Sequence, residues 1–233
     1  MDGIKSEGAI LNVYGDQWRT PLTGATGEHG KARLVSATYA RGYYPMERVG
    51  GHEYYRVRRE RLPVTLLQRH GTLGGEHHPD GWATWMVDDP VHWFGMGERV
   101  AQLQPGRILV AGLGLGLMLH HAAGRADLTT IEVRELDPDV IELVSPLLPV
   151  DPRVSVVQGD FYERLEELAG GPREAWPDAI LWDLAVGNAE QTGGDMLYAR
   201  AAVQTLLPGV PLHRFGLRGP DPAGILDSMS AVW

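Results

Sequence analysis

A short apolar segment that runs directly into closely spaced glycines constrains the fold more than any other feature of this chain. Residues 108–111 (Ile-Leu-Val-Ala) carry no polar side chain, which is typical of a strand buried on both faces of a parallel sheet. Gly112, Gly114 and Gly116 follow at once, and the pattern of residues 117–124 predicts a helix. A strand that passes through glycines into a helix brings bare backbone and the positive end of the helix dipole against a ligand.

The spacing of these glycines argues against a dinucleotide site. The dinucleotide fingerprint G-x-G-x-x-G requires glycine at position 117, where this chain has Leu117. The loop is instead G-x-G-x-G. We expect ligand contacts from Gly112, Leu113, Gly114 and Gly116.

Acidic residues end the strands that are predicted after the glycine loop. Glu135 ends the strand at 129–135 and lies 23 residues after Gly112, where a carboxylate can accept hydrogen bonds from both hydroxyls of a ribose. Asp160 follows the strand at 154–159, and Asp183 ends the strand at 179–183. Ligands in open α/β sheets bind outside the carboxyl ends of the strands, so these acids are expected to share one site.

The second half of the chain alternates between strands and helices. Besides the strands named above, a further strand is expected at 212–217, and helices are expected at 91–103, 117–124, 138–146, 161–169 and 189–206. This alternation predicts an α/β fold with a Rossmann-like, doubly wound parallel sheet.

The N-terminal part is expected to be a small antiparallel β domain. Residues 1–31 are dense in turn formers, so we expect a flexible segment of about 30 residues with one short strand at 10–14. The β segments that follow are 33–39, 54–61, 64–69 and 82–87. Pro63 predicts a break or an edge strand near that position. The predicted division is a β domain at 1–90 and the Rossmann-like core at 91–233.

Composition narrows the classes of partner. The apolar content of 43% is ordinary for a globular protein. No segment is long and apolar enough for a membrane span, and no secretory leader is visible. We therefore expect a cytoplasmic protein. The chain has no cysteine, which excludes disulfides and thiolate chemistry. A net charge of −9 argues against a nucleic-acid partner and leaves a small-molecule substrate as the expectation.

The glycine loop and the acids after it resemble the nucleoside site of class I S-adenosylmethionine (SAM) methyltransferases and of the related polyamine aminopropyltransferases, the spermidine synthase-like proteins. The resemblance implies SAM or decarboxylated SAM as the cofactor. It places Glu135 at the ribose and Asp160 and Phe161 at the adenine, and it includes Leu136 among the cofactor-binding residues. It makes Asp183 the catalytic residue that removes a proton from the acceptor. Aminopropyltransferases also use an N-terminal β domain to dimerise, which implies a homodimer here.

Two departures from the aminopropyltransferase pattern order the possible functions. That family carries an acid between the second and third glycines, where this chain has Leu115, and a further acid shortly after the fourth strand, where residues 184–188 have none. Methyl transfer from SAM to a small molecule is therefore the leading expectation. Aminopropyl transfer from decarboxylated SAM and a non-catalytic nucleoside-binding scaffold remain as alternatives. The 16 residues after 217 are too few for the helix and hairpin that complete a methyltransferase sheet, so we expect either a fold without this hairpin or a shortened chain.

The remaining polar and aromatic clusters are interpreted as structural. Residues 76–80 (Glu-His-His-Pro-Asp) are expected to form a polar loop without a metal, because adjacent histidines in a strand point to opposite faces. His120 and His121 are expected to pack or lie at the surface. The aromatic residues of this region are expected to lie in the β core or at an interface, and some of them could line a pocket. They are Tyr39, Tyr43, Tyr44, Tyr54, Tyr55, Trp82, Trp85 and Trp93.

Overall fold

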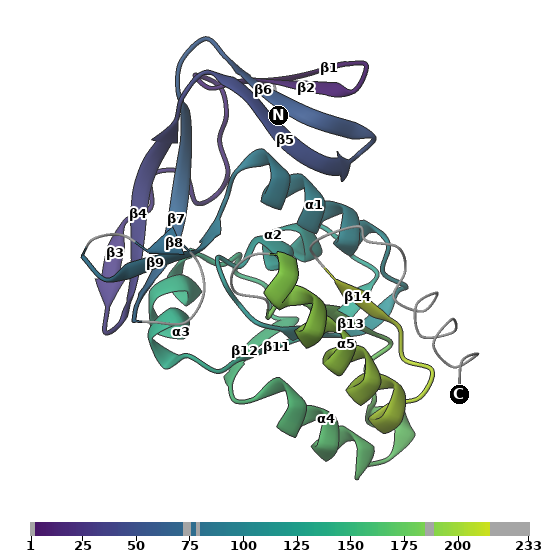
Figure 1. Cartoon of the computed structure of the whole chain (residues 1–233). Helices are drawn as coiled ribbons and strands as arrows, with labels where there is room; N and C mark the ends of the chain where they lie inside the picture. The colour runs from purple at the N-terminus through teal and green to yellow at the C-terminus, as the bar shows by residue number, and fades with distance from the viewer. Residues whose placement is uncertain (1–2, 72–75, 78–79, 185–188, 215–233) are drawn as a thin grey trace.

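The computed structural model describes residues 3–71, 76–77, 80–184 and 189–214. It contains a parallel sheet flanked by helices, and two further β-sheets, formed by the N-terminal part of the chain, that stand beside it (Figure 1).

The parallel sheet confirms the predicted Rossmann-like fold class. Its strands are β10 (Gly106–Ala111), β11 (Leu128–Glu135), β12 (Val154–Gln158), β13 (Ala179–Trp182) and β14 (Leu212–Arg214). They lie in the order β12-β11-β10-β13-β14, and every neighbouring pair is parallel. The chain order reverses between β10 and β13, which is the switch point where ligands bind in such sheets. Residues 215–233, and with them the expected end of the last strand, lie outside the described residues.

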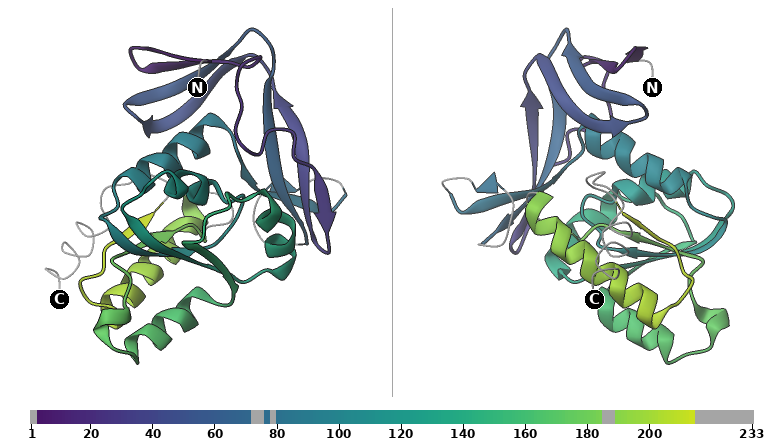
Figure 2. Two further views of the ribbon diagram at one scale, coloured as in Figure 1. Left: turned by 180° about the vertical axis from the view of Figure 1, so that it is seen from behind. Right: turned by 45° about the vertical axis from the view of Figure 1, so that its right-hand side comes forward.

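Helices cover both faces of this sheet (Figure 2). They are α1 (Pro90–Ala101), α2 (Leu117–Ala123), α3 (Pro138–Val144), α4 (Phe161–Ala169) and α5 (Ala189–Leu206), with short 3-10 turns at Ser145–Leu147 and Arg173–Ala175. Their positions agree closely with the pattern expected from the sequence.

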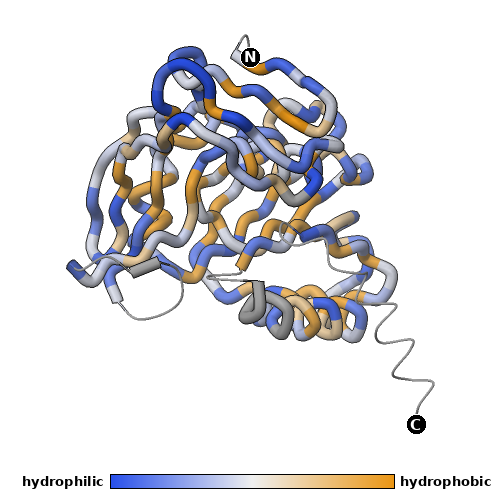
Figure 3. The backbone as a smooth tube through the Cα atoms, turned by 45° about the horizontal axis from the view of Figure 1, so that its top comes forward, coloured by the Kyte–Doolittle hydropathy of each residue, from blue (hydrophilic) through white to orange (hydrophobic). Residues whose placement is uncertain are grey.

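The central strand β10 explains why residues 108–111 are continuously apolar. Ile108 and Val110 pack into the cluster formed with α1, α2 and α3, whereas Leu109 and Ala111 pack into the cluster formed with α4 and α5. Successive side chains of a strand point to opposite faces, so a strand covered on both sides needs an apolar residue at every position. Hydrophobic stretches accordingly gather toward the middle of the molecule, with hydrophilic stretches at its outer loops (Figure 3).

The N-terminal part forms two sheets instead of one. The first has the order β1 (Ile4–Glu7), β2 (Ile10–Tyr14), β6 (His52–Arg58) and β5 (Gly42–Val49). The second has the order β3 (Gly27–His29), β4 (Ala32–Tyr39), β7 (Leu62–His70), β9 (Trp82–Val87) and β8 (Glu76–His77).

Several details of this part differ from the sequence expectations. β5 was not expected, β1 and β3 add two strands to the segment 1–31, and β2 pairs with β6 in parallel, whereas the other pairs of these two sheets are antiparallel. The expected break near Pro63 falls at residues 59–61, and Pro63 itself lies in β7, between β4 and β9.

The β sheets and the helical part contribute to a common hydrophobic cluster. Trp18 and Leu22 are buried with exposed fractions of 1% and 0%, although they lie in the segment expected to be mostly loop. Val13 and Val57 of the first sheet belong to the same cluster as Val133 of β11. A division of the chain at residue 90 remains a prediction.

No helix in the described ranges is long and apolar enough to cross a membrane.

Two half-buried histidines on α2, His120 and His121, pack against α1. The rings of Trp93 and His121 lie 4.3 Å apart between centroids, and the Nε2 atoms of both histidines are buried without a partner in the described structure. Burial lowers the pKa of both imidazoles, and His121 lowers that of His120 further. Their neutral forms are therefore favoured in the folded protein.

The half-buried histidines should make stability depend on pH. Between their lowered folded pKa and the ordinary value near 6.5, the unfolded chain binds more protons, so their contribution to stability is lost as the pH falls through this window. Urea unfolding at roughly pH 7.5 and 5.5 should show a larger acid loss for the wild type than for the double variant His120→Gln/His121→Gln. The variant His52→Gln, at a surface histidine that bonds Ser6, is the control. Equal acid losses in the wild type and the double variant would contradict this assignment.

Candidate functional site

The turn between β10 and α2 has a backbone that only glycine adopts readily. Gly112, Gly114 and Gly116 have φ values of 89°, 50° and 70°, in the left-handed region. Space is also restricted, because a Cβ on Gly112 would lie 2.6 Å from the backbone oxygen of Asp183, and one on Gly114 would lie 2.5 Å from Cε of Met86. The positive φ angles and the close packing of neighbouring atoms therefore both require glycine at these positions.

Glu135, at the end of β11, connects this turn to the start of α3. Its Oε2 accepts from the backbone N–H of Leu113 at 2.8 Å, and its Oε1 accepts from the backbone N–H of Asp137 at 2.9 Å. Each carboxylate oxygen has a second acceptor position. Glu135 can thus hold the loop and still accept two hydroxyl groups from a ligand.

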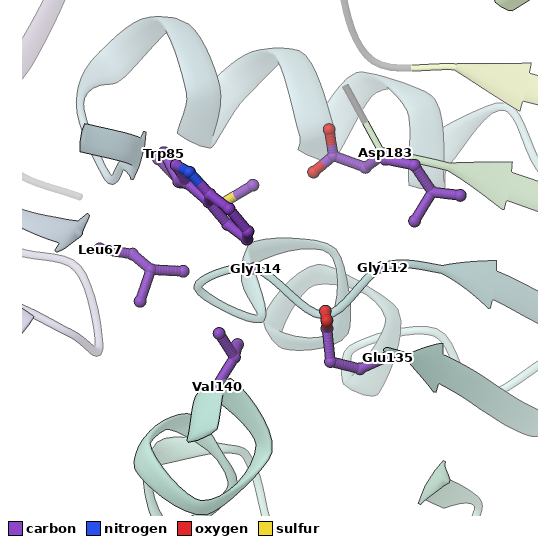
Figure 4. Close-up of a pocket in the computed structure, with 9 residues that line it drawn as sticks. Leu67, Trp85, Gly112, Gly114, Glu135, Val140 and Asp183 are labelled. Atoms are coloured by element: carbon purple, nitrogen blue, oxygen red, sulfur yellow. The ribbon is translucent and has the colours of Figure 1, made fainter. Parts of the chain in front are cut away.

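A pocket opens over the glycine turn. Its lining residues are Leu67, Trp85, Met86, Gly112, Gly114, Glu135, Val140, Asp183 and Leu184. In Figure 4 the carboxyl groups of Glu135 and Asp183 lie on opposite sides of the glycine turn. The ring of Trp85, which belongs to β9 of the second N-terminal sheet, faces them. The structure therefore brings together the loop and two of the three acids at strand ends.

Asp183 lies directly after β13, where its backbone N–H donates to the carbonyl of Ala111 at 2.9 Å. Its carboxyl group is half-buried. Burial raises the pKa of Asp183 to about 6; the nearby His92 acts to lower it, and Glu135 acts to raise it. A carboxyl group with this pKa is ionised at neutral pH and is a stronger base than an ordinary aspartate.

A second pocket adjoins the first and shares Trp85, Glu135 and Leu184 with it. The residues that line only this pocket are Arg69, Arg134, Leu136, Asp137, Pro138, Gly159, Asp160 and Phe161. Leu136 is 66% exposed, which is unusual for a large apolar side chain, so this wall offers an uncovered apolar surface.

Asp160 both lines the second pocket and caps α4. Its Oδ1 accepts from the backbone N–H groups of Tyr162 at 2.6 Å and Glu163 at 3.2 Å. Both of these bonds end on one oxygen, and Oδ2 is the atom left for a ligand. Phe161 is only 2% exposed and belongs to the core cluster between α4 and α5, so it offers the pocket little surface.

Leu113 and Gly116 line neither of these two pockets. Leu113 contributes through its backbone N–H to Glu135, while Gly116 begins α2 and lies next to Leu148. Leu115, between the second and third glycines, is fully buried in the hydrophobic cluster. Its side chain therefore points away from the pocket. The resemblance to aminopropyltransferases implied that the side chain at this position faces the ligand, and in this structure it does not.

Asp137 is the N-cap of α3. Its Oδ1 accepts from the backbone N–H of Asp139 at 3.0 Å, and its Oδ2 forms an ion pair of 2.5 Å with Arg69 of β7. Arg69 also pairs with Asp139 at 3.4 Å. These contacts fasten the second N-terminal sheet to the rim of the second pocket.

Strand β9 forms a wall of the site that sequence reasoning largely missed. Trp85 lines both pockets, and the Met86 sulfur accepts from the backbone N–H of Leu115 in the glycine turn at 3.1 Å. Trp85 was among the aromatic residues considered as possible pocket walls. Nothing local to Met86 marks it, because its role depends on a contact with a turn 29 residues away in the chain.

The segment 76–80 gives no metal site in the described part of the chain, where no group of three or more metal-binding side chains converges. Asp80 instead pairs with Arg33 at 3.0 Å. His78 lies outside the described residues.

Comparison with known proteins gives structural matches only. No family model matches the chain, and no curated protein matches its sequence. Among 172 matching solved chains is human methyltransferase-like protein 13 in complex with SAH, with 22% identity and a TM-score of 0.37 over 58% of this chain and 67% of that one.

Two further matches have similar levels of likeness. A putative O-methyltransferase from Klebsiella pneumoniae has 24% identity and a TM-score of 0.38 over 52% of this chain and 53% of that one. The precorrin 8W decarboxylase of Methanobacterium thermoautotrophicum has 14% identity and a TM-score of 0.42 over 68% of this chain and 77% of that one. The match thus spans about half of the Klebsiella protein. Likeness at this level concerns the Rossmann-like fold alone.

Proposed function

We propose that this chain binds SAM and transfers its methyl group to a small-molecule acceptor. The observation that carries the proposal is the position of Glu135, whose carboxylate joins the glycine turn to α3 and lines both adjoining pockets. A nucleoside with a polar tail needs two connected cavities with a diol acceptor at their junction. Glu135 supplies that acceptor.

The second pocket suits the adenine ring. Exposed Leu136 and the neighbouring Leu184 and Trp85 offer apolar surface to a flat ring, and Oδ2 of Asp160 can accept from an exocyclic amine. Covering an exposed leucine with a ring removes apolar area from water, which favours binding. This fit, together with the glycine turn, is why we prefer a nucleoside to a ligand of another class.

The first pocket suits the reacting end of the cofactor. When bound, SAM supplies a methyl group on a positively charged sulfonium. Glu135 and Asp183 give the pocket two carboxylates, and no cationic side chain is among its lining residues. Their negative charge favours the sulfonium, and Asp183, with a pKa of about 6, accepts the proton that the acceptor loses.

The nucleoside part of the proposal can be tested without knowing the acceptor. In Glu135→Gln, an amide NH₂ replaces one oxygen and faces a backbone donor, so one loop contact and one ribose contact are lost. Calorimetry should show SAM and S-adenosylhomocysteine binding weakened roughly 10- to 100-fold, which is about 1.4–2.8 kcal/mol.

The matched control is Asp178→Asn, because Asp178 also accepts from a backbone N–H, that of Arg107, but does so before β13 at the other end of the sheet. Its affinity should equal that of the wild type. The proposal fails if the wild type binds neither ligand, or if it prefers NAD.

Aminopropyl transfer from decarboxylated SAM is the second candidate, and one contact favours it. The Met86 sulfur occupies the backbone N–H of Leu115, a donor in the glycine turn that could otherwise receive the carboxylate of intact SAM. Two carboxylates without a cation in the pocket lining also suit the free amine of the decarboxylated form. A non-catalytic scaffold is the third candidate, and binding without any transfer would identify it.

Dissociation constants for SAM and decarboxylated SAM should separate the two enzyme candidates. Methyl transfer requires that the wild type bind SAM at least as tightly as the decarboxylated form. Met86→Ala exposes the Leu115 N–H, so we expect it to improve the preference for SAM by roughly 3- to 10-fold, the value of one charge-assisted hydrogen bond in a partly wet site. A conservative Met86→Leu variant, which also lacks the sulfur but refills the space, reports whether volume alone matters. A wild-type preference for decarboxylated SAM would overturn methyl transfer in favour of aminopropyl transfer.

We also propose a homodimer formed through the first N-terminal sheet. Tyr43 on β5 and Tyr54 on β6 are 59% and 47% exposed, which leaves aromatic surface uncovered on neighbouring strands. Light scattering at micromolar concentration should give a dimer, and the double variant Tyr43→Glu/Tyr54→Glu should give a monomer. A monomeric wild type would contradict this proposal.

A further inference from the structure

Strand β9 carries a β-bulge at Trp85. The residue pairs on either side of it in the antiparallel register with β7 are Thr84 with Gln68 and Met86 with Leu67. Trp85 is therefore an extra residue on β9, without an opposite residue on β7. A bulge bends its strand and redirects a side chain, and bulges are frequent beside functional sites for this reason.

The bulge brings Trp85 into the ligand site. Met86 and its cross-strand partner Leu67 both line the first pocket, and the Met86 sulfur fixes this part of β9 to the glycine turn by accepting from the backbone N–H of Leu115. In a regular strand the residue next to Met86 points to the opposite face of the sheet. Trp85 nevertheless lines the same pocket, and the bulge accounts for this.

The indole ring of Trp85 is held by an arginine that is itself fixed. The guanidinium carbon of Arg69 lies 5.5 Å from the ring centroid, and Arg69 forms ion pairs with Asp137 at 2.5 Å and with Asp139 at 3.4 Å, at the start of α3. These two carboxylates compensate the charge of Arg69. The ring thus has a fixed position, and it lies beside a charge that is already neutralised.

Trp85 stands where the two pockets meet. It lines both of them and shares this position with Glu135 and Leu184. Its ring faces the carboxyl groups of Glu135 and Asp183 (Figure 4), and no cationic side chain is among the residues that line the first pocket. Aromatic rings attract cations to their faces, and tryptophan does so most strongly. A cation bound here would meet an indole ring as well as two carboxylates.

We propose that Trp85 is the residue by which the site distinguishes a sulfonium from a neutral thioether, and that its indole ring contacts the positively charged sulfur of SAM where the two pockets meet. This inference deepens the proposed function and rests on it for the identity of the ligand. With the ribose at Glu135, the sulfur, which is joined to the ribose through one carbon, comes next to this junction. Decarboxylated SAM carries the same sulfonium, so the inference holds for both enzyme candidates.

The contact has a consequence for the product. When the methyl group is transferred, the carbon–sulfur bond breaks and its electron pair stays on sulfur, so the sulfur of S-adenosylhomocysteine is neutral. The indole ring then loses the cation that it attracts, whereas the contacts to adenine and ribose are unchanged. The site is therefore expected to bind SAM more tightly than S-adenosylhomocysteine, which favours release of the product.

The test is the ratio of two dissociation constants, that of S-adenosylhomocysteine divided by that of SAM, measured by calorimetry. In Trp85→Leu an apolar side chain remains but the ring is lost, so SAM should lose more affinity than S-adenosylhomocysteine. We expect the ratio to fall roughly 3- to 10-fold below that of the wild type. Trp85→Phe keeps a ring that attracts cations less strongly, and its ratio should lie between the two.

The matched control is Trp82→Leu. Trp82 belongs to the same strand and also has an arginine over its ring, with the guanidinium carbon of Arg33 at 4.2 Å from the centroid, but it lines neither pocket. Its ratio should equal that of the wild type. Incorporation of fluorotryptophan gives a second measurement, because fluorine withdraws electrons from the ring and changes its shape little. It should lower the ratio in the wild type and leave that of Trp85→Phe unchanged, which decides the question if Trp85→Leu does not fold.

The outcomes separate this inference from the proposed function. If Trp85→Leu weakens both ligands equally, or if fluorination leaves the wild-type ratio unchanged, the inference is overturned while the nucleoside site stands, and Trp85 is then an apolar wall. A fall in the ratio confined to the Trp85 variants supports it. A wild type that binds neither ligand would reject the proposed function, and the inference with it.

Discussion

The carboxylate of Glu135 is the contact on which the rest of the site depends. The glycine turn has a backbone without side chains to brace it, and the N–H groups at the start of a helix lack partners within the helix. Glu135 accepts from a backbone N–H of the glycine turn, at Leu113, and from the N–H of the α3 N-cap residue, Asp137, so a single residue sets the separation between the turn and α3. Because two backbone N–H groups hold its carboxylate, the orientation of Glu135 does not depend on a ligand. Less conformational entropy is then lost when a ligand binds.

The core fold could be predicted because its signals are local. Residues 108–111 show the apolar continuity of a strand covered on both sides, and Asp89, Asp137 and Asp160 mark helix starts that the structure contains. The N-terminal sheets were predicted less well, because pairing between distant strands leaves little trace in local periodicity. β5 includes Arg48 at a φ of 53° and an irregular register, which interrupts the alternation by which a strand is recognised.

The site was predictable where it depends on strand ends and not where it depends on packing between layers. Gly112, Glu135 and Asp183 follow from position in the sheet. The direction of the Leu115 side chain, inward to the core, depends on left-handed backbone at three alternate glycines, which no residue pattern specifies uniquely. The Met86 contact arises from β9 crossing above the loop. His92 lies three residues after an acidic helix cap, and the structure places its ring Nδ1 2.8 Å from Oδ1 of that cap, Asp89.

The ion pairs at the rim of the second pocket determine which charges a ligand placed there would meet. Two guanidinium groups line this pocket, but Arg69 is paired with Asp137 and Arg134 with Glu132 at 2.7 Å. A phosphate placed there would meet Glu135 and Asp160 as well, and could reach either arginine only by displacing its carboxylate. The arginines therefore stabilise the framework, and under the proposed nucleoside role a phosphate group would meet no unpaired arginine among the residues that line this pocket.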